Sequence, residues 1–308
     1  MIECNEIFNF YNFIMYAFKM DFNSDSENLL TSEDEYICFE TETESENDES
    51  LDSVRNWIPI DTSAPVPAPP RFPFTGNPGL KVSIETDDPL EYFLQFFDET
   101  VLNFIVDETN KYAENYLATK ELTPSSRLLK WKRTDCQELR RFLGLLLFQG
   151  LVKKPVERFF WSKRPILSTP FFGKVMTEQR YALIMKFSHF EDGEKYDPEN
   201  HPNKKLRKIF DLHPLIIEKF KTVYIPEENI TVDESLIAHK EFLDWKQYIP
   251  SKRARFGMKL FQLCESDSGY IWNSLICTGK GTVLTQDYEK YGLVTKIVMI
   301  LLHDLKGH

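Results

Sequence analysis

Cysteine is scarce in this sequence, which holds five cysteines in 308 residues. None belongs to a Cys-x-x-Cys pair and none has a histidine at metal-ligand spacing: they are Cys4, Cys38, Cys136, Cys264 and Cys277. A disulfide framework or a zinc site needs such pairing. The spacing therefore argues against both, and we expect reduced thiols in an intracellular protein.

Long apolar runs are absent as well. No run approaches the roughly 18 residues that a membrane-spanning helix needs. The first 20 residues are rich in Phe and Tyr, but Glu3 and Glu6 occupy the place where a signal peptide carries positive charge. We therefore expect no membrane partner, and we assign this segment no targeting role.

Basic residues are missing from one long segment. Between Asp21 and Asp52 the sequence has 13 carboxylates and no Lys or Arg. The net charge of −11 belongs to the first 52 residues, because residues 53–308 hold 36 basic and 33 acidic residues. A composition with so few apolar residues cannot bury enough surface to offset chain entropy. We predict that residues 1–70 are a disordered acidic tail followed by a Pro-rich linker.

Apolar residues at helical spacing begin after this linker. Asp88 is a good N-cap and Pro89 suits the first helical position, so a helix is expected there. Asp135 and Glu138 have the spacing of a capping box, and Gly150 is expected to close that helix. Further helices are expected over 177–190 and 205–224, the last open to interruption at Pro214. The block from 88 to 225 is thus predicted to be all helical, and the helical region as a domain is assigned to residues 71–228.

The period of the pattern changes near residue 229. Strands are predicted over Ile230–Ile237, Met258–Glu265 and Tyr270–Thr278, with Ser266–Gly269 as a hairpin turn between the last two. Helical spacing returns from Val294 to Leu305. Three strands and a helix after an all-helical region predict an α+β fold.

Two long stretches carry an unusual order of residues. They are Ile230-Thr-Val-Asp-Glu-Ser-Leu236 and Trp245-Lys-Gln-Tyr-Ile-Pro-Ser-Lys-Arg-Ala-Arg-Phe-Gly-Met-Lys259. Both resemble the core of the piggyBac transposases, and especially the domesticated piggyBac transposable element-derived proteins. Upstream, Asp88-Pro-Leu-Glu-Tyr-Phe93 and Gly150-Leu-Val-Lys-Lys-Pro155 resemble the helical dimerisation and DNA-binding region of that family.

The resemblance implies a cut-and-paste DNA transposase. In that family a ribonuclease H-like domain binds two Mg²⁺ ions through three catalytic aspartates. Asp233 matches the first aspartate, and the second and third lie beyond His308. Residues 229–308 then correspond to the first β-β-β-α part of an incomplete catalytic domain, and we expect a truncated, piggyBac-derived DNA-binding protein of the nucleus without transposase activity.

Asp233 is the candidate catalytic and metal-binding residue. Two-metal phosphoryl transfer needs carboxylates on both sides of an ion pair, so one aspartate would bind Mg²⁺ weakly in an incomplete site. Glu234 is no substitute, because adjacent strand residues point to opposite faces of a sheet.

Cations interleaved with aromatic residues form the candidate DNA contacts. They are Lys246, Lys252, Arg253, Arg255 and Lys259, near Trp245, Tyr248 and Phe256. Clustered cations beside rings suit a phosphate backbone, although a solvated charged loop would have the same composition. A second, weaker cluster consists of Lys204, Lys205, Arg207 and Lys208, and either cluster could be a nuclear import signal.

The expected partner is double-stranded DNA, with a homodimer as a further possibility and no small-molecule substrate. Two alternatives stay open. The chain could be a fragment of an active DNA transposase that continues downstream. It could also be a protein-interaction module in which the helical region dimerises and the acidic tail competes with DNA for the basic patch.

Overall fold

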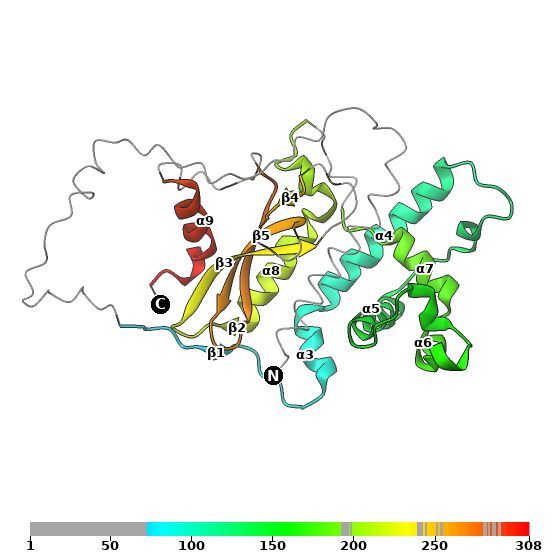
Figure 1. The fold of residues 1–308 in the computed structure, drawn as a ribbon, viewed down its shortest axis with the longest axis horizontal. Coiled ribbons are helices and arrows are strands. Elements are labelled where there is room, and N and C mark those ends of the chain that lie inside the picture. The colour runs from blue at the N-terminus through cyan, green and yellow to red at the C-terminus, as the bar shows by residue number, and fades with distance from the viewer. Residues whose placement is uncertain are drawn as a thin grey trace, which may run out of the picture.

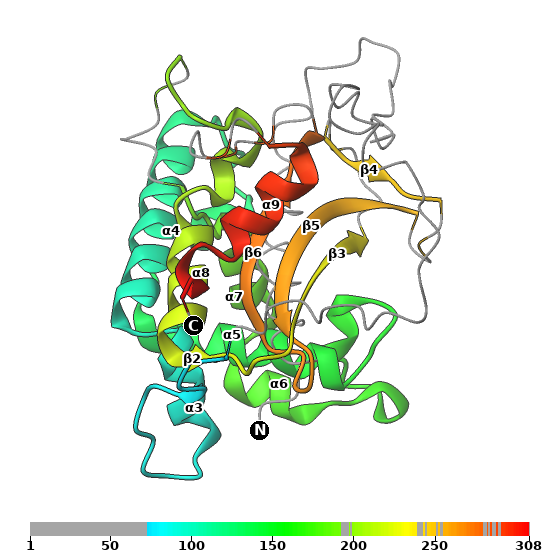
Figure 2. The same ribbon diagram turned by 90° about the vertical axis from the view of Figure 1, so that its left-hand side faces the viewer.

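The computed structural model describes residues 73–191, 197, 199–238, 243, 245–250, 252, 255–279, 282, 284, 288 and 291–307. Within these residues a block of helices stands beside an antiparallel sheet (Figures 1 and 2). The predicted mixture of helix and sheet is therefore confirmed. The predicted acidic tail and nearly all of the Pro-rich linker lie outside the described residues.

The helical block contains six α-helices among the described residues. They are α3 (Pro89–Phe96), α4 (Glu99–Thr119), α5 (Cys136–Leu151), α6 (Pro170–Val175), α7 (Glu178–Phe187) and α8 (Leu212–Val223). Short polar side chains cap the helix starts as predicted. The carboxylate of Asp88 accepts the Leu90 amide at 2.9 Å, and that of Asp135 accepts the Glu138 amide at 2.8 Å. Each cap satisfies an amide that the helix itself leaves without a partner.

Two predicted helix breaks lie elsewhere. Gly150 is inside α5, which continues to Leu151, so the prediction that it closes the helix was wrong. The segment 205–224 breaks at Phe210 and Asp211, between a 3₁₀ turn over Lys204–Ile209 and α8. Pro214 follows within the first turn of α8, where a missing amide costs no hydrogen bond.

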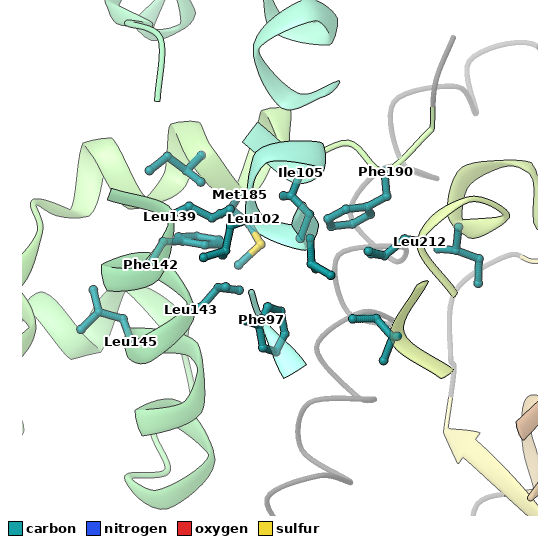
Figure 3. Close-up of a cluster of buried hydrophobic side chains, with 14 of the residues drawn as sticks. Phe97, Leu102, Ile105, Leu139, Phe142, Leu143, Leu145, Met185, Phe190 and Leu212 are labelled. Atoms are coloured by element: carbon teal, nitrogen blue, oxygen red, sulfur yellow. The ribbon is translucent and has the colours of Figure 1, made fainter. Parts of the chain in front are cut away.

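A continuous apolar core joins the helices to the sheet. Figure 3 shows part of it, in which Leu102 of α4 lies beside Leu139 and Phe142 of α5, and Ile105 lies toward Phe190. Sheet residues such as Leu260 belong to the same cluster. Fully burying each such side chain contributes about 1.5–3 kcal/mol, so this core fixes the sheet against the helical block.

The sheet has four described strands: β3 (Ile230–Ala238), β4 (Gln247–Tyr248), β5 (Phe256–Glu265) and β6 (Ile271–Cys277). The long strand β5 pairs antiparallel with the other three. The three predicted strands are confirmed within two residues at each end. The hairpin turn between β5 and β6 is confirmed too, and it ends at Gly269 with a φ of +69°.

Helices cover both faces of this sheet. Helix α8 lies on one face and α9 (Leu293–Leu301) on the other (Figure 1). Leu263, Trp272, Ile297 and Leu301 form a separate buried cluster under α9.

Two short strands, one before the helical block and one after it, were not predicted. Tyr224 and Ile225 form β2, which pairs with Gly79 and Leu80 of β1 and so ties the N-terminal arm to the start of the sheet.

Among the described helices, none has the length and apolar character to cross a membrane.

Candidate nucleic-acid interface

Asp233 lies in the middle of β3 with an exposed side chain. Its register partner on β5 is Gln262, which in turn pairs with Ser274 of β6. One carboxylate oxygen of Asp233 accepts the backbone amide of Glu234 at 2.7 Å. This amide therefore points away from β5, along the edge of β3 that no described strand covers. Asp233 thus stands at an accessible edge of the sheet, with one oxygen already engaged.

Glu234 occupies the opposite face from Asp233, as strand alternation predicts. Its register partner is Phe261, which packs against the cluster under α9. The Glu234 carboxylate lies 2.7 Å from the ammonium of Lys259 and 3.7 Å from that of Lys252. Lys252 also donates to the Glu234 carbonyl oxygen at 3.3 Å. Two of the predicted DNA-binding lysines are therefore engaged by one carboxylate.

Lys259 is further confined by its surroundings. Its side chain is only 12% exposed and its ammonium lies 4.7 Å from the centre of the Phe261 ring. These contacts give Lys259 a structural role in the sheet that sequence reasoning did not anticipate.

An aromatic and cationic surface forms where β4 meets the start of β5. Tyr248 and Phe256 are register partners, and their ring centres are 4.7 Å apart. The ammonium of Lys246 lies 5.6 Å from the Phe256 ring, and Arg255, which precedes Phe256 in the sequence, is exposed. We call Lys246, Tyr248, Lys252, Arg255 and Phe256 the hairpin surface. Of the predicted cluster, Arg253 lies outside the described residues.

Gly257 explains how β5 can begin so close to β3. A Cβ atom at this position would lie 2.1 Å from the carbonyl oxygen of Ile237, which no side chain tolerates. The glycine therefore lets three strands meet around it, since Gly257 pairs with Ala238 of β3 and Gln247 of β4. This close approach places Tyr248 beside Phe256.

The second basic cluster is largely used in holding the chain together. Lys205 donates to the Thr278 carbonyl oxygen at 3.0 Å, and the guanidinium of Arg207 lies 3.1 Å from the carboxylate of Glu191. Lys204 is exposed and Lys208 is half-buried. Burial raises the pKa of Glu191, although Arg207 opposes this shift. The structure therefore joins only part of this cluster into an accessible cationic surface.

Sequence reasoning missed a group of hydrogen bonds around Glu265, at the end of β5 and next to the start of β3, which we call the Glu265 hub. Glu265, which is 3% exposed, accepts the Tyr224 hydroxyl at 2.7 Å, the Glu227 amide at 2.9 Å and the Ser268 hydroxyl. Burial acts to raise the pKa of Glu265, but these hydrogen bonds outweigh it and hold the pKa below its usual value. The hub fixes the connection that leads into β3 and so positions Asp233. A glutamate at a strand end gave no signal of this role.

The described residues do not fit a complete two-ion centre. Among them, no group of three or more His, Cys, Asp or Glu side chains lies close enough to hold a metal ion. Asp233 provides one carboxylate, with the uncharged Gln262 opposite it.

Comparisons with known proteins place this chain in a family. The model of the Transposase IS4 family matches residues 88–308, and the chain therefore belongs to that family. It is similar to the human PiggyBac transposable element-derived protein 2, with 28% identity over 201 residues. This alignment covers 64% of the chain and 30% of the human protein.

A solved structure shows the same fold. It is the cryo-electron microscopy structure of piggyBac transposase in a synaptic complex with hairpin DNA, matched with a TM-score of 0.61 and 22% identity. The match covers 72% of this chain and 44% of the other. The resemblance to piggyBac-type transposases is therefore confirmed, and the chain spans less than half the length of each of these relatives.

Proposed function

We propose that this chain is a transposase-related protein that binds double-stranded DNA through the hairpin surface. The observation that carries the proposal is the Tyr248–Phe256 pair, with Lys246 over one ring and an exposed arginine, Arg255, next to Phe256 in the sequence. Cations that neutralise phosphates release counterions, which supplies most of the affinity of sequence-independent binding. The chain's similarity to piggyBac transposase, whose matched structure is a complex with hairpin DNA, supports this proposal.

A merely solvated loop explains these residues less well. Phe256 is 39% exposed although it sits at the start of a strand whose following residues, Gly257 and Met258, are buried. An exposed ring near a cation gains from apolar contact with a thymine methyl group in the major groove as well as from the charges. Both kinds of contact are available at the hairpin surface.

We further propose that residues 229–308 form part of a ribonuclease H-like domain. The antiparallel order of β3, β5 and β6 and the helix α9 after them are consistent with such a domain. Asp233 would then be one ligand of its Mg²⁺ ions, which stabilise charge on the reacting phosphate in two-metal chemistry. A nuclear location and a homodimer built on the helical block belong to the same proposal.

Salt dependence tests the interface. We expect the slope of log affinity against log salt to fall by about 1.8 in Lys246→Ala/Arg255→Ala, because each lost phosphate contact removes about 0.9. Fluorescence anisotropy with a labelled duplex over 50 to 200 mM KCl measures it. The variant Lys130→Ala/Lys132→Ala removes the same charge from two exposed lysines outside the hairpin surface. Equal slopes in the two variants would contradict the proposal.

A further inference from the structure

The helical block exposes a group of large apolar side chains at its outer end. They come from the last turn of α5, the connection after it, and α6, and we call them the tip patch. Its members are Phe148 (43% exposed), Leu151 (70%), Val156 (44%), Ile166 (91%) and Phe171 (51%). Single exposed apolar residues are ordinary, but a contiguous group marks a surface that binds something.

Contacts join the segments that carry these residues. The rings of Phe148 and Phe171 are 5.1 Å apart, and Leu151 follows Phe148 by one helical turn. Lys154 donates to the Leu167 carbonyl oxygen at 2.9 Å, which fixes the segment carrying Val156 against the turn carrying Ile166. The patch is therefore a preformed surface of the folded chain, away from the sheet (Figure 1).

Positive charge surrounds the tip patch. Between Gly150 and Val175 the sequence has six cations and one acid. Five of these cations are exposed: Lys153, Arg158, Lys163, Arg164 and Lys174. A matching partner must therefore combine negative charge with apolar side chains. The phosphate backbone of a duplex has the charge but offers little apolar surface to cover Leu151 or Ile166.

We propose that residues 1–52 of this chain bind the tip patch. They contain 15 carboxylates against one lysine, and six of the first 20 residues are Phe or Tyr. This is the combination of charge and apolar side chains that the patch requires. Residues 53–72 can extend to about 66 Å, more than the roughly 45 Å diameter expected for a compact body of 235 residues. The inference concerns a second surface and does not depend on DNA binding.

Carbodiimide cross-linking of the full chain tests this proposal. The reagent joins carboxylates to lysines in direct contact, and mass spectrometry maps the products. We expect links from acids of residues 1–52 to Lys153, Lys163 or Lys174. These should fall at least threefold in Leu151→Ser/Ile166→Ser. They should persist in Leu80→Ser/Val294→Ser, which changes two exposed apolar residues elsewhere.

Three outcomes would overturn the inference. The first is the absence of links to the tip lysines, and the second is an equal yield of links in the two double variants. The third is a set of links that join the tip of one copy to the tip of another, detected by mixing isotope-labelled and unlabelled chains, because a second copy would then cover the patch. Circular dichroism of each variant checks that the helical block stays folded.

Discussion

The ammonium of Lys259 on β5 lies 2.7 Å from the carboxylate of Glu234 on β3. The two residues are diagonal neighbours, since Lys259 is the register partner of Leu236. Glu234 also lies 3.7 Å from Lys252, a member of the hairpin surface. One acid therefore offsets two cations next to the proposed DNA interface, and its removal has a calculable consequence.

We predict that Glu234→Gln strengthens DNA binding. Freeing a cation for a phosphate contact adds about 0.9 to the magnitude of the salt slope, so an increase of about 0.9 is expected from Lys252, the member of the hairpin surface that Glu234 engages. Affinity measured in 50 to 200 mM KCl tests it. Glu121→Gln, a change at an exposed acid outside this site, is the control and should leave the slope unchanged. Weaker binding by Glu234→Gln would show that the carboxylate is needed to shape the interface.

Glu265 is predicted to stabilise the start of the sheet. Glu265→Ala leaves the half-buried Tyr224 hydroxyl and the backbone amide of the exposed Glu227 without this charged acceptor, which costs about 1–3 kcal/mol. Urea unfolding followed by circular dichroism measures this loss. A change below about 0.5 kcal/mol would mean that the hub contributes little.

The contribution of Glu265 to the free energy of unfolding is also expected to depend on pH. Because its folded pKa is lowered, the stability from Glu265 is complete above the unfolded pKa near 4.5 and is lost as the pH falls through the folded pKa. The difference in unfolding free energy between the parent and Glu265→Ala should therefore be constant from pH 7 to about pH 5.5 and shrink below it. A difference that grew on acidification would contradict the assignment.

Arg180 and Glu138 are predicted to clamp α7 to α5. The guanidinium binds both carboxylate oxygens, at 2.7 and 2.5 Å, and lies 4.7 Å from the Trp131 ring. Arg180→Ala should cost about 2 kcal/mol, because charge-assisted bonds in a partly buried site are strong. Arg133 forms a more exposed pair with Glu114, so Arg133→Ala should cost less than about 1 kcal/mol. Equal losses on urea unfolding would contradict this difference.

Two glycines are predicted to respond to alanine with opposite signs. Gly257→Ala forces a Cβ atom into the Ile237 carbonyl, so it should destabilise the sheet by about 1–3 kcal/mol and weaken DNA binding. Gly144 lies inside α5 with nothing within 4 Å of its Cβ position, and Gly144→Ala should stabilise by about 0.5–1 kcal/mol. Thermal unfolding of both variants compares them directly. Similar effects would contradict the account of Gly257.

Features set by neighbouring residues could be predicted from the sequence. The caps at Asp88 and Asp135 depend on amides two or three residues away, and β3 follows from the alternation of apolar and polar residues over Ile230–Asp233. The other half of the predicted capping box differs from the prediction: the Glu138 side chain pairs with Arg180 across the helical block. That contact is set by tertiary packing, which no local pattern contains.

In the candidate site, too, some features follow from neighbouring residues and others depend on tertiary packing. The order of residues in the run that contains Tyr248 and Phe256 was enough to predict that cations and rings share one segment. It could not show that Lys259 and Lys252 meet Glu234, or that Arg207 meets Glu191, because these pairs form only when distant segments fold together. The two-residue strand β4 was missed because it is held by pairing with β5 and has no period of its own.

Mapping the DNA contact by photocross-linking tests the central claim most directly. A duplex carrying 5-iodouracil, irradiated with the full chain and digested with protease, labels the residues that touch the DNA. We expect adducts within residues 245–259, at Tyr248 or Phe256, and the loss of the Phe256 adduct in Phe256→Leu. A chain that binds the duplex but carries its adducts only outside this segment would contradict it.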